Sequence, residues 1–416
     1  FTTFATCMLV FPLCGVALIK TDNLHENNIG QIFSDYLTKA GNAQIARTTL
    51  QENDIITTII GATEEVIARS ALILSEYLPA NINQNIVQIR IDQTIAYPEY
   101  INAYLNSKFG RQYLRYLSRQ TEQVNLNCAE VGLTIVPQFS NVIQEAIKNC
   151  SVLAHKLQTE AKQSYVEAEL LLTNALSMPS FTTSKQSISI ITLSKSYDCS
   201  GRLDAEYYQP KYDDYIDSLH TADTVNSLCN IYDKNFVPES DVEYMYIELA
   251  NIGGSGSIND VGSVLGNNLP SRARRKVKTG QVIIASIEGS LQSCALITRE
   301  YNNALCSTGF YVLDSNEINS ETLLVLFKSE PIQALLRQRC SGTILTAITK
   351  DEFLNMPLPR IDESTQKHIA SKVLESFALR HQSERLLEYA KRAVEIAIEQ
   401  GEEKALFWLK EKEVEA

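Results

Sequence analysis

The sequence carries the same order of segments twice, and this internal duplication constrains the fold more than any other feature. ALIKTDNLHENNIG in the first copy corresponds to MYIELANIGGSGSI in the second, and LQENDIITTIIGATEEVIARSALI corresponds to VKTGQVIIASIEGSLQSCALI. Each copy ends at a proline, Pro137 or Pro359, before a long helical pattern. The copies are 228 residues apart from Asn23 to Asn251, and 222 residues apart between the two prolines. Solenoid repeats recur every ~20–50 residues, so this unit is a duplicated domain with an appended helix.

Each copy is predicted to be an α/β (α+β) domain. In the first copy GVALIKT, NDIITTII, RSALIL and NIVQIRI favour strands. A helix is predicted from about Pro98 to Ser118, because proline suits the first turn of a helix. We therefore expect a curled or mixed sheet in each domain. We assign residues 1–139 and 187–359 to the two domains, 140–178 and 360–416 to two spacer helices, and 179–186 to a linker.

Both long helices carry a seam of apolar residues spaced three or four positions apart. In the first helix, expected over about Asn141 to Leu176, the seam is Ile143, Ile147, Cys150, Ala154, Leu157, Ala161, Tyr165, Ala168 and Leu172. In the second, expected from about Glu363 to the chain end, it is Ile369, Val373, Phe377, Leu387, Ala390, Val394 and Ala397, with a polar middle. Such spacing predicts a partner helix. We expect the two helices to pack as an antiparallel coiled coil, a spacer of roughly 50 Å.

The first copy is expected to lack its beginning. The second copy has a lead-in from about Ser187 to Tyr244, including GRLDAEYYQPKYDDYIDSL, which predicts a turn and a helix. The first copy has only Phe1 to Val16 before the corresponding segment.

Composition excludes several classes of protein. The nine cysteines show no Cys-x-x-Cys pair, which favours reduced thiols in a cytoplasmic protein over a disulfide framework or a metal site. The apolar start lacks a basic segment and is broken by Pro12 and Gly15, so we expect no signal peptide and no membrane span. The net charge of −12 argues against non-specific coating of nucleic acid.

One basic run stands out against this acidic background. SRARRKVK places five cationic side chains together without an acidic residue: Arg272, Arg274, Arg275, Lys276 and Lys278. The run is either a solvated loop or a binding site for phosphate groups.

The sequence offers no catalytic motif. The glycine-rich segment from Gly253 to Ser257 is not followed by Gly-Lys-Ser/Thr, so a hairpin turn is favoured over a phosphate-binding loop. No Gly-x-Gly-x-x-Gly, Gly-x-Ser-x-Gly or Asn-Pro-Pro-Tyr segment is present. We therefore expect neither catalytic nor metal-binding residues.

Short polar loops recur at equivalent places in the two copies and are the candidate contacts to DNA bases. In the first copy they contain Asn81, Asn83, Gln84 and Asn85, and later Gln123, Asn125 and Asn127. In the second they contain Cys306, Ser307 and Thr308, and later Thr343, Thr346 and Thr349. Amides can bond adenine bidentately, and hydroxyls can bond bases or phosphates. The same residue types also cap turns and helices, so a purely structural role stays open.

These segments, in this order, resemble the specificity subunits of type I restriction-modification systems over essentially the whole chain. The resemblance is carried by GVALIKTDNL, LQENDIITTIIGA, ANINQNIVQIRI, YLNSKFGRQYL, SRQTEQVNLN and TIVP, and in the second copy by GRLDAEYYQPKY and LNMPLP before the long helix. It implies two target-recognition domains, each recognising one half of a split sequence in double-stranded DNA, on an antiparallel helical spacer. Unlike loops predict an asymmetric target.

The resemblance also implies the partners. It implies assembly with two adenine-N6 methyltransferase subunits and two motor-nuclease restriction subunits. The cofactors S-adenosylmethionine, and ATP with Mg, would belong to those partners, and this chain would do no chemistry. The alternative is a tandem protein-interaction module on a coiled-coil scaffold with no role in DNA binding, which the paired helices favour equally.

Overall fold

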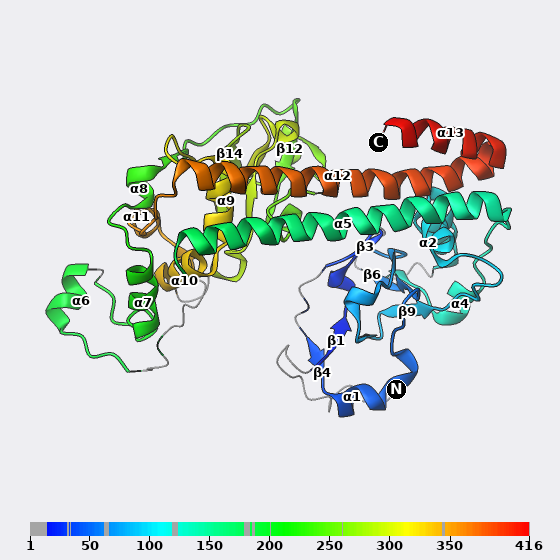
Figure 1. The fold of residues 1–416 in the computed structure, drawn as a ribbon, viewed down its shortest axis with the longest axis horizontal. Coiled ribbons are helices and arrows are strands. Elements are labelled where there is room, and N and C mark those ends of the chain that lie inside the picture. Colours follow the sequence, from blue (N-terminus) through cyan, green and yellow to red (C-terminus); the bar gives the residue numbers. More distant parts are fainter. Residues whose placement is uncertain are drawn as a thin grey trace. The chain divides into compact units, whose positions relative to one another are not determined.

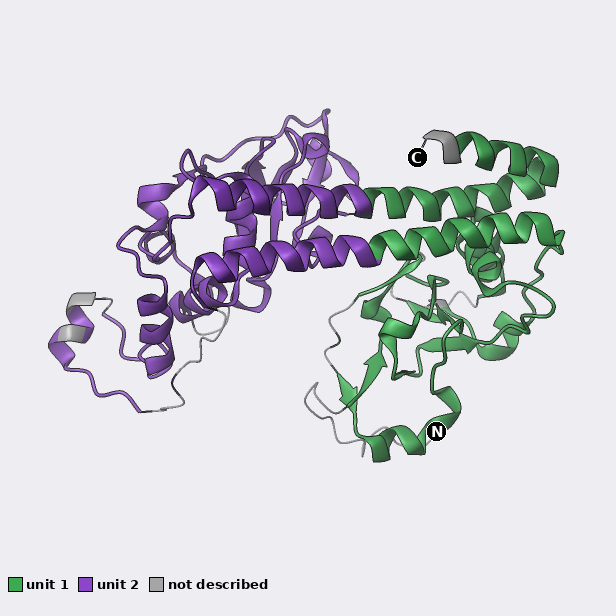
Figure 2. Ribbon diagram, viewed as in Figure 1, with its two compact units in different colours: residues 1–158, 380–416 green, residues 159–379 purple. Residues whose placement is uncertain are grey.

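The computed structural model describes residues 15–30, 33, 35–61, 66–118, 124–178, 184, 188–199, 201–259, 261–342 and 346–415 (Figure 1). The chain divides into two compact units (Figure 2). Unit 1 comprises residues 1–158 and 380–416, and unit 2 comprises residues 159–379. Each unit therefore holds one α/β domain together with a portion of both long helices.

Unit 1 contains two three-stranded sheets. The first has the order β4 (Tyr36–Leu37), β1 (Val16–Ile19), β8 (Ala80–Ile82), and β1 runs antiparallel to β4 but parallel to β8. The second, antiparallel throughout, has the order β7 (Ser70–Leu72), β5 (Ile55–Thr58), β9 (Ile86–Ile89). Two short pairs are β2 (Leu24–His25) with β3 (Asn28–Ile29), and β6 (Ile60–Gly61) with β10 (Val124–Asn125). The predicted strands and the mixed sheet are confirmed.

Unit 2 contains two four-stranded sheets. The first has the order β13 (Ser263–Leu265), β12 (Glu243–Ile247), β17 (Leu305–Ser307), β14 (Ala273–Lys276). The second has the order β11 (Asn230–Ile231), β18 (Phe310–Asp314), β15 (Val282–Ala285), β16 (Cys294–Leu296). A short pair joins β19 (Cys340–Ser341) to β20 (Ala347–Ile348).

The strand pairing repeats between the units, which confirms the duplication at the level of topology. Strand β1 pairs antiparallel with β4 and parallel with β8, and β12 pairs in the same two ways with β13 and β17. Strand β5 lies between β7 and β9 just as β15 lies between β16 and β18. Unit 2 adds an edge strand to each sheet, β14 and β11.

Two consecutive helices follow the sheets in each unit. They are α2 (Pro98–Asn106) and α3 (Lys108–Leu117) in unit 1, and α9 (Ser320–Lys328) and α10 (Glu330–Arg339) in unit 2. The single helix predicted from Pro98 to Ser118 is therefore wrong. Ser107 lies in an extended conformation between the two helices, and its hydroxyl accepts from the backbone N–H of Gly110 at 3.2 Å. A serine that caps a new helix ends the previous one, and apolar periodicity alone does not reveal this.

Shorter helices complete both units. In unit 1 these are α1 (Lys39–Gln44) and α4 (Cys128–Gly132). In unit 2 they are α6 (Leu193–Cys199), α7 (Pro210–Ser218), α8 (Val225–Leu228) and α11 (Lys350–Leu354). Helix α7 confirms the helix predicted in the lead-in of the second copy. Most of the predicted linker lies outside the described residues.

The first long helix, α5 (Asn141–Ala175), buries the whole predicted seam, from Ile143 to Leu172. Along the other long helix, α12 (Glu363–Gln400), Ile369, Val373, Ala390, Val394 and Ala397 are buried as predicted. In its middle, Leu386 is buried where Leu387 was expected.

The two long helices are antiparallel within each unit. In unit 2 the hydroxyl of Ser376 donates to the carbonyl of Ala161 at 2.6 Å, and that of Ser164 donates to the carbonyl of Lys372 at 3.0 Å. In unit 1 the hydroxyl of Ser383 donates to the carbonyl of Ala154 at 2.7 Å. Partner numbers fall along α12 as they rise along α5, so the predicted antiparallel packing is confirmed. The polar middle of the second seam consists of serines that face alanines, which lets the backbones approach closely.

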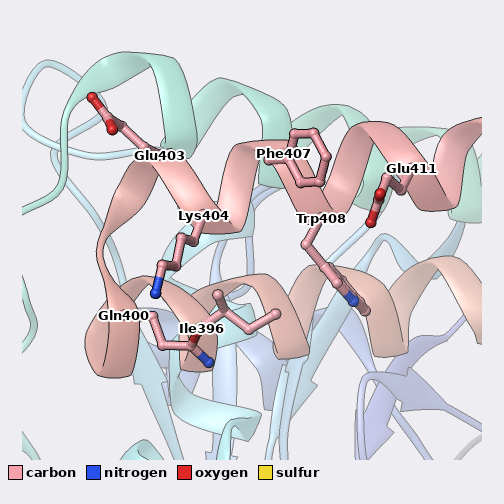
Figure 3. A pocket seen from close by; sticks show the side chains of 7 residues that line it. All are labelled: Ile396, Gln400, Glu403, Lys404, Phe407, Trp408 and Glu411. Carbon is pink, nitrogen blue, oxygen red and sulfur yellow. The ribbon is translucent and has the colours of Figure 1, made fainter.

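The second long helix does not continue to the chain end as predicted. Gly401, with φ at +94°, ends α12, and a separate helix α13 (Glu402–Glu415) follows. Glycine adopts this left-handed conformation without steric cost and commonly follows the last turn of a helix. Helix α13 turns back over α12, where Ala405 and Leu409 are buried and the Trp408 ring packs edge-on against Tyr389 (Figures 1 and 3).

No helix in the described parts of the chain combines the length and the apolar character needed to cross a lipid bilayer.

Candidate nucleic-acid interface

The recurring polar loops of unit 1 lie side by side because one residue hydrogen-bonds to both. The backbone N–H of Ile59, just after β5, donates to the carbonyl of Asn85 at 2.9 Å. The carbonyl of Ile59 in turn accepts from the N–H of Leu126 at 2.8 Å. The loop between β8 and β9 therefore adjoins strand β10, although about forty residues separate them in sequence.

Unit 2 repeats this arrangement with different residues. The N–H of Ser286, just after β15, donates to the carbonyl of Gly309 at 2.9 Å, and its carbonyl accepts from the N–H of Ile348 at 2.9 Å. The loop between β17 and β18 is thereby joined to strand β20. We call this pair of bonds the loop bridge, formed by Ile59 in unit 1 and Ser286 in unit 2. Both units present a polar two-loop surface built on the same backbone scaffold.

Within the first loop of each pair, one residue shapes the turn and the next forms its tip. The side-chain oxygen of Asn83 accepts from the N–H of Asn85 at 3.1 Å, and the hydroxyl of Ser307 accepts from the N–H of Gly309 at 3.2 Å. Asn83 and Ser307 are therefore occupied in holding the turn. Gln84 and Thr308 occupy the exposed tips, so these two residues are the best placed to contact a ligand.

The residues predicted in the second loop divide into exposed and structural ones. Asn125 is exposed on β10, while Gln123 and Thr343 lie outside the described residues. The hydroxyl of Thr346 donates to the exposed carboxylate of Glu288. Asn127 caps α4 and Thr349 caps α11, each through the backbone N–H three residues on.

Asn81 also has a structural role. It is fully buried, and its amide donates to the side chain of Asn42 at 2.7 Å and to the carbonyl of Ile45 at 3.2 Å. It therefore anchors β8 to the segment around α1.

The basic run forms the edge strand β14 and is thereby brought to the tip of the unit 2 loop. Strand β14 runs antiparallel to β17, with Ala273 opposite Ser307, and the N–H of Thr308 donates to the carbonyl of Arg272 at 2.8 Å. Arg272 is exposed at this end. Lys278 is exposed beyond the opposite end of the strand, about 20 Å further along at ~3.3 Å per residue. The five cations are thus spread along a strand, and Arg272 is nearest the loops.

The middle of the run faces two different environments. The Lys276 ammonium lies 5.0 Å from the centroid of the Phe236 ring. Arg275 is half-buried on the β17 side, and one guanidinium nitrogen, NH1, is buried with no hydrogen-bond partner among the described residues. Burial raises the pKa of the neighbouring Cys306 thiol to about 12, which the positive charge of Arg275 partly opposes. Arg274 bonds locally, donating from Nε to the carbonyl of Ser271 at 2.9 Å.

Two residues of this surface were not predicted from the sequence. Ser286 forms the loop bridge through its backbone, which no side-chain pattern reveals. Glu288 lies in the EGSLQ segment, and its carboxylate, beside Thr346, is suited to accept from the exocyclic amine of cytosine. Among the described residues no cluster of His, Cys, Asp and Glu is arranged to hold a metal ion.

Comparison with known proteins finds similarity among solved structures. No family model and no curated protein matches the sequence. The HsdS subunit from Thermoanaerobacter tengcongensis is 15% identical, with 93% of this chain and 90% of that chain covered and a TM-score of 0.29. The type I restriction-modification S subunit from M. genitalium is 12% identical, with 93% and 89% covered and a TM-score of 0.38.

A third similar structure is described by its complex assembly and conformational transition in the type I restriction-modification system. It is 14% identical, with 93% and 92% of the two chains covered and a TM-score of 0.29. Similarity at this level does not by itself assign a function, so the proposal below rests on the chain's own residues.

Proposed function

We propose that this chain is a DNA specificity subunit that recognises a two-part, asymmetric target through its two α/β domains. The observation that carries the proposal is the loop bridge, which presents a different set of polar side chains on the same backbone scaffold in each unit. Gln84 with Asn125 in unit 1 offers amides, whereas Thr308 with Thr346 and Glu288 in unit 2 offers hydroxyls and a carboxylate. A duplicated scaffold with unlike tips suits two different half-sites.

The direct contacts fall to different chemical groups in the two domains. Amide side chains suit adenine, for which they can donate and accept at the major-groove edge. Arg272 beside Thr308 suits a backbone phosphate, which would fix the register of the second domain on the duplex. The acidic remainder of the chain leaves other phosphate contacts to partner subunits, consistent with the net charge of −12.

In this proposal the chemistry belongs to the partners. Two methyltransferase subunits with S-adenosylmethionine would methylate adenine at N6, and motor-nuclease subunits with ATP and Mg would cleave unmodified DNA. The paired helices α5 and α12 would set the number of unread base pairs between the half-sites.

Methylation sequencing of a host that carries this chain with its neighbouring methyltransferase gene tests the proposal. We expect adenine methylation in two different short motifs at one fixed spacing. Methylation without a split motif, or none in a host where the methyltransferase is expressed, would contradict it and favour the protein-interaction module.

The spacer role has its own test. Insertion of seven residues into α5, with a matching heptad in α12, lengthens the helix pair by about 10 Å at ~1.5 Å per residue. We expect the unread gap to grow by about three base pairs at ~3.4 Å each, with both half-motifs unchanged. A four-residue insertion is the control, because it breaks the seam and should abolish binding. A change in the half-motifs themselves would contradict the spacer role.

A further inference from the structure

Helices α3 and α10 hold equivalent places in the two units but differ in what covers them. Each follows a nine-residue helix and begins after a serine, Ser107 or Ser329, in the same extended conformation. Both are ten residues long and are shifted by 222 residues. Residues of α3 can therefore be compared one by one with residues of α10.

Helix α10 is covered by the lead-in of its own domain. The amide of Gln338 donates to the carbonyl of Tyr207 at 2.9 Å, and the Tyr215 hydroxyl donates to Glu330 at 2.7 Å. Tyr212 and Tyr215 of α7 are buried in the same apolar cluster as Leu335 and Leu336. Residues 202–218 thus form an extended segment and a helix that lie against α10.

The equivalent face of α3 is exposed. Tyr116 is 81% exposed, whereas its counterpart Gln338 is 7% exposed. Gln112 is exposed and Tyr113 is half-buried, while Leu335, the counterpart of Tyr113, is fully buried. The rings of Tyr113 and Tyr116 lie 6.4 Å apart and form an aromatic surface. Within the described part of unit 1 no segment takes the place of α7.

The charge of α3 complements the segment that covers α10. Helix α3 carries Lys108, Arg111 and Arg115 and no acidic residue. Residues 202–218 carry five acidic residues and two basic ones. Arg115 stands where α10 has Arg337. Burial acts to raise the pKa of Glu206, but hydrogen bonds from Lys211 and Tyr212 and the charge of Arg337 hold it below its usual value.

We propose that the open face of α3, formed by Gln112, Tyr113, Arg115 and Tyr116, docks an acidic helical segment of a partner chain with the chemistry of residues 202–218. The aromatic pair would receive the apolar face of that helix, and Arg115 would receive its acidic residue. One contact would not be repeated, since Lys108 replaces Glu330 and its ammonium pairs with Glu399 of α12. The proposal does not depend on DNA recognition.

A fluorescent peptide of residues 201–219, titrated with the full chain and followed by anisotropy, tests this docking. We expect saturable binding that weakens at least tenfold in Tyr116→Ala and in Arg115→Glu. Arg47→Glu is the matched control, because Arg47 is equally basic and exposed in unit 1 but lies outside α3. A peptide with Glu206→Lys should bind the native chain weakly and recover binding to Arg115→Glu.

Two results would overturn the proposal. One is binding unaffected by the α3 variants but abolished in Arg337→Glu, because the peptide would then be exchanging with α7 on α10. The other is unchanged peptide binding together with weakened binding of a short DNA duplex in the same α3 variants, which would make this face a nucleic-acid surface. Absence of any saturable binding would also overturn it. Thermal melting of each variant checks the fold, which the exposure of Tyr116 should leave intact.

Discussion

The α/β domains of units 1 and 2 agree in backbone and differ in side chains where the loops meet solvent. Ile59 and Ser286 make the same two hydrogen bonds, yet the tips they support carry Gln84 in one unit and Thr308 in the other. The sheet edge differs as well, because unit 2 adds β14 with its cations where unit 1 has a short turn around Arg47. A backbone-defined scaffold can thus keep its geometry while the surface it presents changes.

Exchange of the loop tips should have the largest effect on this comparison. Replacing Ser307, Thr308 and Gly309 by Asn, Gln and Asn transplants the unit 1 loop into unit 2. The backbone should accept it, since a Cβ on Gly309 would meet its neighbours no closer than 3.5 Å. We expect the second half-motif to change, and affinity for the original target to fall by about 1–3 kcal/mol for each bidentate pairing with a base that the exchange removes. Binding to a randomised duplex library measures this, and an unchanged motif would exclude the loop from base recognition.

The basic strand should have the next largest effect, on affinity and not on sequence preference. Arg272→Gln should weaken DNA binding and lower the salt dependence of log K by about one. Lys278→Gln is the matched control and should change both less, because Lys278 lies beyond the far end of β14. Titrations at several salt concentrations compare them. Equal effects would show that the whole strand lies along the DNA.

Acid stability should separate the two domains next. The Asp54 carboxylate is buried and accepts from the N–H of Gln51 at 2.7 Å and from Arg90 at 2.7 and 2.8 Å. Burial acts to raise the pKa of Asp54, but these bonds hold it below the usual 3.8. Gln281, which accepts from the N–H of Lys278 at 2.8 Å, takes its place in unit 2 without a charge.

Because the folded-state pKa of Asp54 is depressed, its stabilisation is fully present above pH 3.8 and is lost as the pH falls through the folded value. Asp54→Asn should cost about 1–2 kcal/mol of unfolding free energy near pH 7 and almost nothing in strong acid. Gln281→Ala should show no such pH dependence. Urea unfolding of each variant across this range measures the difference, and parallel pH profiles would contradict it.

The smallest expected effect lies in the turns before β5 and β15. Asn53 and Gly280 hold equivalent places with φ at +69° and +85°. Gly280→Ala should cost about 1 kcal/mol, because a β-carbon is strained in this conformation. Asn53→Gly should change stability by a few tenths of a kcal/mol, since asparagine and glycine both tolerate it. Thermal melting compares them, and an equal loss in both would show that side-chain contacts decide the turn.

Much of the fold followed from local pattern. The seam of α5 was predicted residue by residue, because a heptad spacing leaves only one face to bury. The strands around Ile55 and Ile86 followed from β-rich segments bounded by turn residues. The breaks at Ser107 and Gly401 did not follow, since a cap and a left-handed residue interrupt helices without disturbing apolar periodicity.

The candidate site was predicted only in part. The sequence singled out the polar loops and the basic run as separate features of uncertain role. The structure joined Arg272 to Thr308, assigned Asn81, Asn127 and Thr349 to structural duties, and added Glu288. Backbone hydrogen bonds between distant segments made those decisions.

The sequence by itself determined that the chain holds two related domains, each with a long helix, because duplication and periodicity are properties of residue order. Only the tertiary structure decided which polar residues face outward together. That depends on strand pairing and loop contacts between segments tens of residues apart, and on whether a neighbouring helix covers a face, as α7 covers α10 but leaves its counterpart α3 exposed.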